Sequence, residues 1–443
     1  MQTETKISKL EKIIDTARKN GANSVEVIQK SKTENPVSFE NNKLKSLESN
    51  QSSGIAVRLI KNKKIGMSTS TDPEALESIA TSAIEASEFG PDATFEFAKE
   101  KLDCRDAVNQ VSKGLPLEEL VDRGTKVIDH LKSFHKDLLV SGGFDVSLGE
   151  TIYLNSNGVY GKRTKSIYTT SFSIFLVQDE DFLGIYEGNR DLKTFPDEKE
   201  IADKIFKKLE LSKNLVPVET KKYTVIFTPA AVASIFGEIL GVMLNGKVVQ
   251  QKISPLTDKV GKELFDRKLS FIENPSFGVK ASPFDDEGIK TTQKTLIKTG
   301  IINGFYFDLS CGSRVMPRHD STGNGFKGSL AQTPSPGLTS LLIENGKTNY
   351  NDLIKNTKEG ILIDQVLGAG QSNMLAGEFS VGIDLGFKIK DGKIKGRIKN
   401  CMISGNIFDV LKNITEISKE QEWVYGSMYF PYFLIDGMTV AGK

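Results

Sequence analysis

The spacing of apolar residues predicts several amphipathic helices in the first half of the chain. Apolar residues recur every three or four positions before Gly21, where a helix is expected to end: Ile7, Leu10, Ile14 and Ala17. A second helix is predicted from Asp72, which can cap it, and from Pro73, which suits a first turn. Two further helices, at about residues 117–134 and 197–211, each carry one apolar stripe.

Strands are predicted between these helices, where apolar residues alternate with polar or small ones. Residues 53–61 and 65–70 form a predicted hairpin that turns at Asn62. The remaining strand signals lie at residues 138–145, 151–154, 166–177 and 183–186. The first half of the chain is therefore predicted to mix helices and strands.

Glycine and strand signals dominate the chain from about residue 220 onward. One long helix is predicted there, at residues 229–244, in an apolar run that also contains Glu238. Asp391 and Gly392 form a predicted hairpin turn between two short strands. The second half of the chain is therefore predicted to be β-rich.

Two boundaries divide the chain into three predicted units, and the predicted fold class is α+β. The boundaries are a polar stretch at residues 102–113, which is typical of a linker, and the Val216-Pro217 pair. The units are residues 1–105, an N-terminal α+β domain; residues 106–216, a middle α+β domain; and residues 217–443, a β-rich C-terminal domain. A chain of 443 residues is also too long for one ordinary hydrophobic core.

Charge and cysteine content limit the classes of function. Lys and Arg total 58 and Asp and Glu total 57, so the basic surplus of a dedicated nucleic-acid binder is missing. The cysteines, Cys104, Cys311 and Cys401, lie far apart, which argues against a disulfide framework and fits a reducing compartment. No apolar stretch is long enough for a membrane span, and the N-terminus lacks a secretory apolar region. We therefore expect a soluble, cytoplasmic protein.

Two segments have some features of phosphate-binding sites. Residues 323–328 match the glycine spacing of a dinucleotide-binding loop, but no apolar strand precedes them, and Pro334 and Pro336 follow where a helix is required. The lysine-rich residues 387–400 could face phosphates, but they lack the aromatic residues that stack on bases. We interpret the first segment as a turned loop and the second as a solvated strand face, and we expect no nucleic-acid partner.

The histidines do not form an evident metal site. His130 and His135 lie five residues apart on one predicted helix, so they point about 140° apart and cannot hold one ion together. His319 lies in a polar loop, where a hydrogen-bonding role is favoured over catalysis because no nucleophile is near it in sequence.

Short motifs in a characteristic order give the most specific signal. They are residues 68–73 (STSTDP), 225–229 (VIFTP), 237–242 (GEILGV), 282–288 (SPFDDEG), 298–302 (KTGII), 321–324 (STGN) and 438–442 (MTVAG). Through them the chain resembles the TldD/PmbA family over essentially its whole length. The resemblance implies two N-terminal mixed α/β segments and a β-rich C-terminal domain. It also implies a link to proteolysis and peptide-antibiotic maturation, and an older label as a modulator of DNA gyrase.

The resemblance also implies that this chain carries a degenerate form of the family's zinc motif. TldD-type chains carry His-Glu-x-x-x-His on a helix in the third segment, with a cysteine near the C-terminus as a further ligand. Here the two histidine positions are Gly237 and Val242, the cysteine position is Tyr425, and Glu238 is retained. Glycine and valine offer no lone pair, so no metal and no cofactor are expected in this chain. Glu238 is interpreted either as an exposed helix residue or as a residual part of a substrate groove.

This pattern is the one the resemblance implies for the TldE/PmbA branch. The predicted function is a non-catalytic subunit, a pseudoenzyme inactive alone, in a TldD/TldE-type metalloprotease complex that acts on unfolded peptides. The predicted partner is a zinc-bearing TldD-like subunit or a second copy of the chain. Two alternatives remain open: a homodimeric peptide-binding or scaffold protein without protease activity, and a metal-independent hydrolase. The hydrolase lacks an evident nucleophile motif such as Gly-x-Ser-x-Gly.

Overall fold

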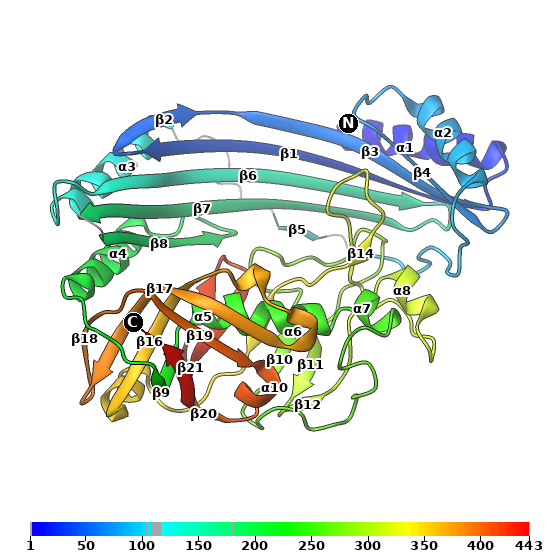
Figure 1. The fold of residues 1–443 in the computed structure, drawn as a ribbon. Helices are drawn as coiled ribbons and strands as arrows, with labels where there is room; N and C mark the ends of the chain where they lie inside the picture. Colours follow the sequence, from blue (N-terminus) through cyan, green and yellow to red (C-terminus); the bar gives the residue numbers. More distant parts are fainter. Residues whose placement is uncertain (1, 103–104, 108–116, 179–180, 443) are drawn as a thin grey trace.

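A long, curved sheet lies over a second, β-rich part of the chain in the computed structural model, which describes residues 2–102, 105–107, 117–178 and 181–442 (Figure 1). The strand order of this sheet is β4-β3-β1-β6-β7-β5, with β2 paired to β1 and β8 paired to β7. Its strands are β1 (Ser24–Glu40), β2 (Lys43–Leu47), β3 (Asn50–Lys61), β4 (Lys64–Ser70), β5 (Arg105–Ala107), β6 (Leu139–Asn155), β7 (Tyr160–Gln178) and β8 (Asp181–Asp191).

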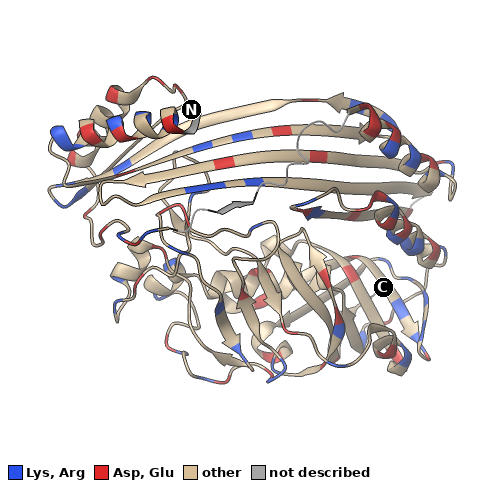
Figure 2. Ribbon diagram, turned by 180° about the vertical axis from the view of Figure 1, so that it is seen from behind, with Lys and Arg blue, Asp and Glu red and all other residues tan. Residues whose placement is uncertain are grey.

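Four helices cover one face of the curved sheet, two at each end: α1 (Gln2–Lys19), α2 (Leu76–Glu88), α3 (Leu117–Lys132) and α4 (Glu198–Ser212). Val27 packs with α1 and α2, and Val37, on the same side of β1, packs with α3 and α4. The helices carry many positive and negative residues, and the long strands carry them at wider intervals (Figure 2). This division is the amphipathic pattern that the sequence predicts.

The opposite face of the curved sheet turns toward the β-rich part. From β7, Arg163 Nη1 donates to Ser282 Oγ at 2.9 Å, and Lys165 Nζ donates to the Val279 carbonyl at 3.0 Å. From β1, the Lys30 ammonium forms an ion pair with Asp286 at 2.6 Å. These contacts fix the two parts of the chain against each other.

The β-rich part is built on a sheet of order β12-β11-β10-β15-β21-β19-β17-β16-β9, with β18 paired to β17, β20 paired to β21, and β21 also paired to β9. Its strands are β9 (Lys221–Phe227), β10 (Phe271–Glu273), β11 (Lys294–Lys298), β12 (Ile301–Ile302), β15 (Leu341–Ile343), β16 (Glu359–Leu367), β17 (Glu378–Lys390), β18 (Lys393–Arg397), β19 (Cys401–Asn406), β20 (Ile414–Val424) and β21 (Met428–Ala441). A separate pair consists of β13 (Gly325–Phe326) and β14 (Ser335–Pro336).

Short helices connect these strands. They are α5 (Pro229–Val232), the π-helical turn η2 (Ala233–Gly237), α6 (Glu238–Met243), α7 (Gly246–Gln250), α8 (Leu309–Arg314), α9 (Tyr350–Asn356), η3 (Ala369–Gln371), η4 (Met374–Ala376) and α10 (Ile407–Val410). Within the described ranges, no helix combines the length and the apolar character that a membrane crossing requires.

The predicted fold class is confirmed, since mixed α/β elements precede a strand-rich C-terminal region. Two local predictions were wrong. The helix expected from Asp72 begins at Leu76, because the Asp72 carboxylate accepts the Glu74 N–H in a turn. The two strands predicted at residues 138–145 and 151–154 are one strand, β6 (Leu139–Asn155), because the polar residues between them also pair with β7.

Two further sequence features are placed by the structure. The hairpin turn at Asp391 and Gly392 is confirmed, and both residues have positive φ angles, 51° and 70°. Lys388 in this hairpin is buried beside Glu359 rather than solvated. Most of the linker predicted at residues 102–113, including Cys104, lies outside the described residues.

Candidate functional site

The helix that carries the degenerate zinc motif is interrupted by a π-helical turn. Thr228 caps its start by accepting the Ala231 N–H, and Pro229 occupies the first turn. At η2 the Glu238 N–H reaches back five residues to the Ala233 carbonyl. The predicted helix at residues 229–244 is therefore correct in extent to within one residue, but it is not regular. Such single π turns occur often at functional sites.

Gly237, the first histidine position, lies against an aromatic ring. A Cβ at Gly237 would lie 3.0 Å from Phe430 Cε2 and 3.8 Å from Met428 Sδ. Phe430 is fully buried, so the ring cannot move aside into solvent. A side chain at this position would therefore require the Phe430 ring to shift by a few tenths of an ångström within the core.

Glu238 and Val242 follow Gly237 in α6. In a regular helix, Gly237 and Val242 are five residues apart and point about 140° away from each other, whereas Glu238 and Val242 are four apart and point to nearly the same side. The π turn ends at Gly237 and so precedes this stretch. Glu238 is exposed and forms no hydrogen bond or ion pair within the described part of the chain. This position agrees with the interpretation of Glu238 as an exposed helix residue.

Tyr425, the cysteine position, lies in the tight turn between β20 and β21. Its φ is 53°, and its side chain is 45% exposed. The hairpin places Val424 opposite Met428, the residue that also borders the space at Gly237. The structure thus brings the hairpin and the motif helix together, while the Tyr425 side chain faces a neighbouring cavity.

These positions do not fit a zinc ion. A tetrahedral zinc site needs imidazole, thiolate or carboxylate ligands, and Gly237, Val242 and Tyr425 supply at most one phenol. Among the described residues, no group of three or more His, Cys, Asp or Glu side chains is placed to hold a metal ion. We therefore derive no metal-dependent step for this chain.

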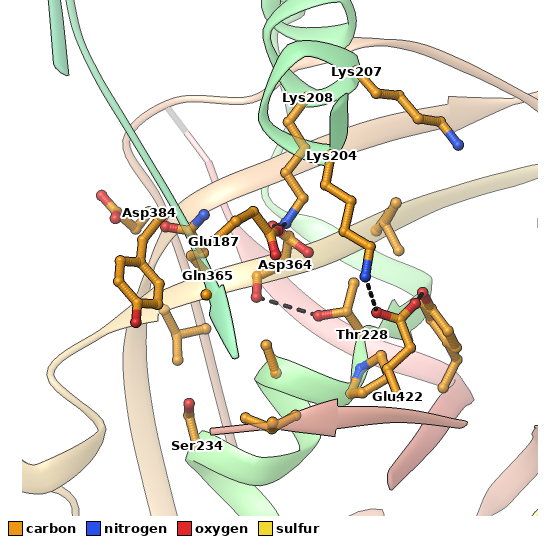
Figure 3. A pocket seen from close by; sticks show the side chains of 18 of the residues that line it. Glu187, Lys204, Lys207, Lys208, Thr228, Ser234, Asp364, Gln365, Asp384 and Glu422 are labelled. Carbon is orange, nitrogen blue, oxygen red and sulfur yellow. Dashed lines mark hydrogen bonds and ion pairs between the residues drawn. The ribbon is translucent and has the colours of Figure 1, made fainter. Parts of the chain in front are cut away.

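A cavity of about 430 Å³ lies where the curved sheet meets the β-rich part (Figure 3). Strand β8 and helix α4 form one wall, and α5, η2, β16, β17 and the end of β20 form the others. The polar and aromatic residues that line it include Tyr186, Glu187, Lys204, Lys207, Lys208, Ser234, Tyr350, Asp364, Gln365, Asp384, Glu422, Trp423, Tyr425 and Tyr432. The cavity was not predicted from the sequence, because its lining comes from eight separated segments.

Lys208 joins two walls of this cavity. Its ammonium forms ion pairs with Glu187 on β8 and with Asp364 on β16. Burial lowers the pKa of Lys208, but the two carboxylates outweigh burial and raise the pKa above its ordinary value. Burial raises the pKa of Glu187, and Lys208 partly offsets this effect. The bridge therefore holds a charged lysine at the junction of the two parts.

A second polar cluster lies at the other end of the cavity. The Lys204 ammonium lies 3.6 Å from Glu422, and the Tyr432 hydroxyl donates to the same carboxylate. The Tyr350 ring stacks on Tyr432, with 4.1 Å between ring centroids. Burial raises the pKa of Tyr350 to about 12, so its hydroxyl stays protonated at neutral pH.

One wall of the cavity continues into an exposed apolar surface. On β8, Phe182 and Tyr186 point to the same side as Phe175 and Val177 on β7 and Leu139 on β6. All five side chains are between 40% and 59% exposed. We call these five residues the apolar strip. Four of them lie outside the cavity, and Tyr186 connects the strip to it.

Comparison with known proteins places this architecture among metallopeptidase-related chains. The model of the PmbA/TldA metallopeptidase C-terminal domain matches residues 220–442, and that of PmbA/TldA metallopeptidase domain 1 matches residues 25–87. The chain therefore belongs to the PmbA/TldD family, as the sequence motifs predicted.

Individual relatives match the chain over its whole length. It is 22% identical to Metalloprotease PmbA of Escherichia coli O157:H7, over 100% of this chain and 98% of that protein. It is 24% identical to an uncharacterized protein of Methanocaldococcus jannaschii, over 97% and 99%. The crystal structure of TldE from Thermococcus kodakarensis has a TM-score of 0.91 at 25% identity, over 98% of this chain and 100% of that one.

Proposed function

We propose that this chain is a non-catalytic subunit of a TldD/TldE-type metalloprotease, and that it binds unfolded peptide for a zinc-bearing TldD-like partner. The observation that carries the proposal is Gly237 at the first histidine position, where the buried Phe430 ring would have to shift to admit any side chain. Val242 and Tyr425 likewise provide no imidazole or thiolate at the other two ligand positions. Family membership and the likeness to a TldE structure support the same assignment.

Two features support a role in binding extended peptide. Strand β8 pairs only with β7 within the described residues, so its other edge, where Arg397 donates to the Phe182 carbonyl, has no strand partner and can accept an added strand beyond that residue. The apolar strip offers contact surface to the apolar side chains that an unfolded peptide exposes. Both features border the cavity, and this arrangement suits a surface that holds peptide beside a partner's active site.

The proposal includes association and location. A chamber shared between two chains needs a large interface, commonly more than about 2,000 Å² in obligate pairs. We place the complex in the cytoplasm, because Cys311 and Cys401 are free thiols and no disulfide framework is expected. The partner is a TldD-like subunit; a homodimer is the alternative.

Co-expression with a TldD-like chain tests the proposal. We expect the two chains to purify together and to cleave an unfolded peptide only in combination, with all zinc in the partner and with loss of cleavage after chelation. Cleavage by this chain alone that resists chelators would support the metal-independent hydrolase instead. A stable homodimer that binds peptide, ignores the TldD-like chain and leaves its activity unchanged would support the scaffold protein.

A further inference from the structure

The charges that line the cavity are unevenly paired. Three lysines and four carboxylates give the lining a formal net charge of −1. Lys208 is shared by Glu187 and Asp364, and Lys204 is paired with Glu422. The Lys207 ammonium points away from the other labelled side chains (Figure 3). The remaining carboxylate is Asp384, which forms no hydrogen bond or ion pair within the described part of the chain.

Asp384 faces the cavity because its strand, β17, is out of regular register with the neighbouring strand β16. Ile363 pairs with Gly386 and Gln365 pairs with Leu385, so Asp364 on β16 has no partner opposite it. The next pair is Val366 with Ile383, so Asp384 on β17 has none either. Such bulges redirect side chains and are frequent beside binding sites. Burial raises the pKa of the half-buried Asp384, and Arg397 partly offsets this.

A free donor lies at the same end of the cavity as Asp384. The Gln365 amide Nε2 is buried and has no acceptor within the described residues. Figure 3 shows Gln365 and Asp384 together at one end of the cavity, away from Lys204 and Glu422. A ligand that satisfies both groups must offer a donor to the carboxylate and an acceptor to the amide.

Aromatic side chains also line the cavity. They include Tyr186 and Tyr425, each 45% exposed. Trp423 also lines the cavity, and its ring packs on Phe277 with 4.4 Å between centroids. Aromatic faces attract cations and tolerate the apolar stem of an amine, whereas they give nothing comparable to an anion.

We propose that this cavity binds the primary ammonium group of a peptide on the Asp384 carboxylate. The N-terminal residue of a peptide fits best, because its ammonium can pair with Asp384 while its carbonyl oxygen accepts from Gln365. The side chain of a lysine in the peptide is the other source of the same group. This inference rests on the proposed function, since it specifies which part of an unfolded peptide the chain recognises.

Binding of three short peptides to the wild-type chain tests the inference. The first is an alanine–leucine hexapeptide amide with a free amino terminus, the second is its acetylated form, and the third is the acetylated form with one lysine. Trp423 is the only tryptophan of the chain and lines the cavity, so its fluorescence reports binding there, with calorimetry as a second measurement. We expect the free amine to bind about tenfold more tightly than the acetylated peptide, since an ion pair is lost on acetylation.

Two variants test whether Asp384 causes the preference for the free amine. Asp384→Asn should remove the preference for the free amine. Asp258→Asn, which changes net charge equally at an exposed position outside the cavity lining, should keep it. If the lysine peptide regains affinity in the wild-type chain, the site binds an ammonium from either source; if it does not, the site is specific for the chain terminus. Both results support the inference.

Equal affinity of the free and acetylated peptides in the wild-type chain would overturn the inference without any variant. A preference that persists in folded Asp384→Asn would also overturn it. Neither result affects the proposed function, which fails separately if the TldD-like partner cleaves peptide equally well without this chain.

Discussion

Replacing Gly237 by histidine tests whether the first ligand position is closed by packing. The added Cβ would lie 3.0 Å from the Phe430 ring, whereas carbon atoms pack best at about 3.5–4.0 Å. Overpacking a core lowers the free energy of unfolding by about 1–3 kcal/mol, and replacing a glycine inside a helix raises it by at most about 1 kcal/mol. We therefore expect Gly237→His to lower the free energy of unfolding by about 1–2 kcal/mol. Urea unfolding followed by Trp423 fluorescence measures this loss.

Gly241 provides a matched control on the same helix. A Cβ there meets nothing closer than Leu338 Cδ1 at 3.9 Å, so Gly241→His gains the same helix propensity without the clash. We expect it to be neutral within about 0.5 kcal/mol or slightly stabilising.

A double-mutant cycle with Phe430→Ala then assigns the cost to that ring. Phe430→Ala alone should cost about 3–5 kcal/mol, because it leaves a cavity in the core. The imidazole can occupy part of this cavity, so the double variant should be less destabilised than the sum by about 0.5–3 kcal/mol. If Gly237→His costs no more than Gly241→His, or if the double variant is additive, the position is open and the packing argument is wrong.

Three more predictions address the site and the junction of the two parts. Gly237→His with Val242→His should bind zinc weakly, as measured against a chromophoric chelator, because residues five apart point about 140° away from each other and Phe430 crowds the first position. Adding Tyr425→Cys should not raise the affinity, because the Tyr425 side chain faces the neighbouring cavity, and tight binding by the triple variant would contradict this placement. Lys208→Met leaves the Glu187 and Asp364 carboxylates without their lysine and should lower the free energy of unfolding in urea by about 3 kcal/mol. An unchanged midpoint of urea unfolding would contradict the stabilising role of the Lys208 ion pairs. Burial lowers the pKa of Lys165 to about 8, so between pH 8 and 10.5 the unfolded chain binds more protons and stability should rise with pH. In Lys165→Met, the free energy of unfolding in urea should rise less with pH over this range. An unchanged rise would contradict the assignment of this pH dependence to Lys165.

Much of the fold could be predicted from local patterns because helices and hairpins depend on residues close in sequence. The helix α4 begins at Asp197, whose carboxylate accepts two backbone N–H groups, and the Asp391-Gly392 turn has the positive φ angles that such turns require. The degenerate ligand positions stay a prediction from the sequence, in which glycine at position 237 offers no zinc ligand. The contact of Gly237 with Phe430, almost two hundred residues away, could not be predicted.

The cavity could not be predicted, because it depends on long-range register. Asp384 resembles an ordinary strand residue in sequence, and only the bulge opposite Gln365 turns it toward the cavity. The ion pair between Lys208 and Asp364 joins segments separated by 156 residues. The π turn in the motif helix likewise has no distinct sequence signal, since residues 229–244 have the spacing of a regular helix.

The position of β21 determines when the β-rich part can form during synthesis. This strand pairs with β9, β15, β19 and β20, so it joins segments that span more than two hundred residues. The curved sheet uses only residues up to 191 and can form while later residues are still being translated. The β-rich part cannot close until residues 428–441 leave the ribosome, so the hydrophobic surfaces of β9 and β15 stay open until then. During much of its synthesis, the nascent chain therefore consists of a folded curved sheet attached to an incomplete β-rich part. At this stage its unpaired strands are most exposed, and chaperones have the largest strand surface to protect.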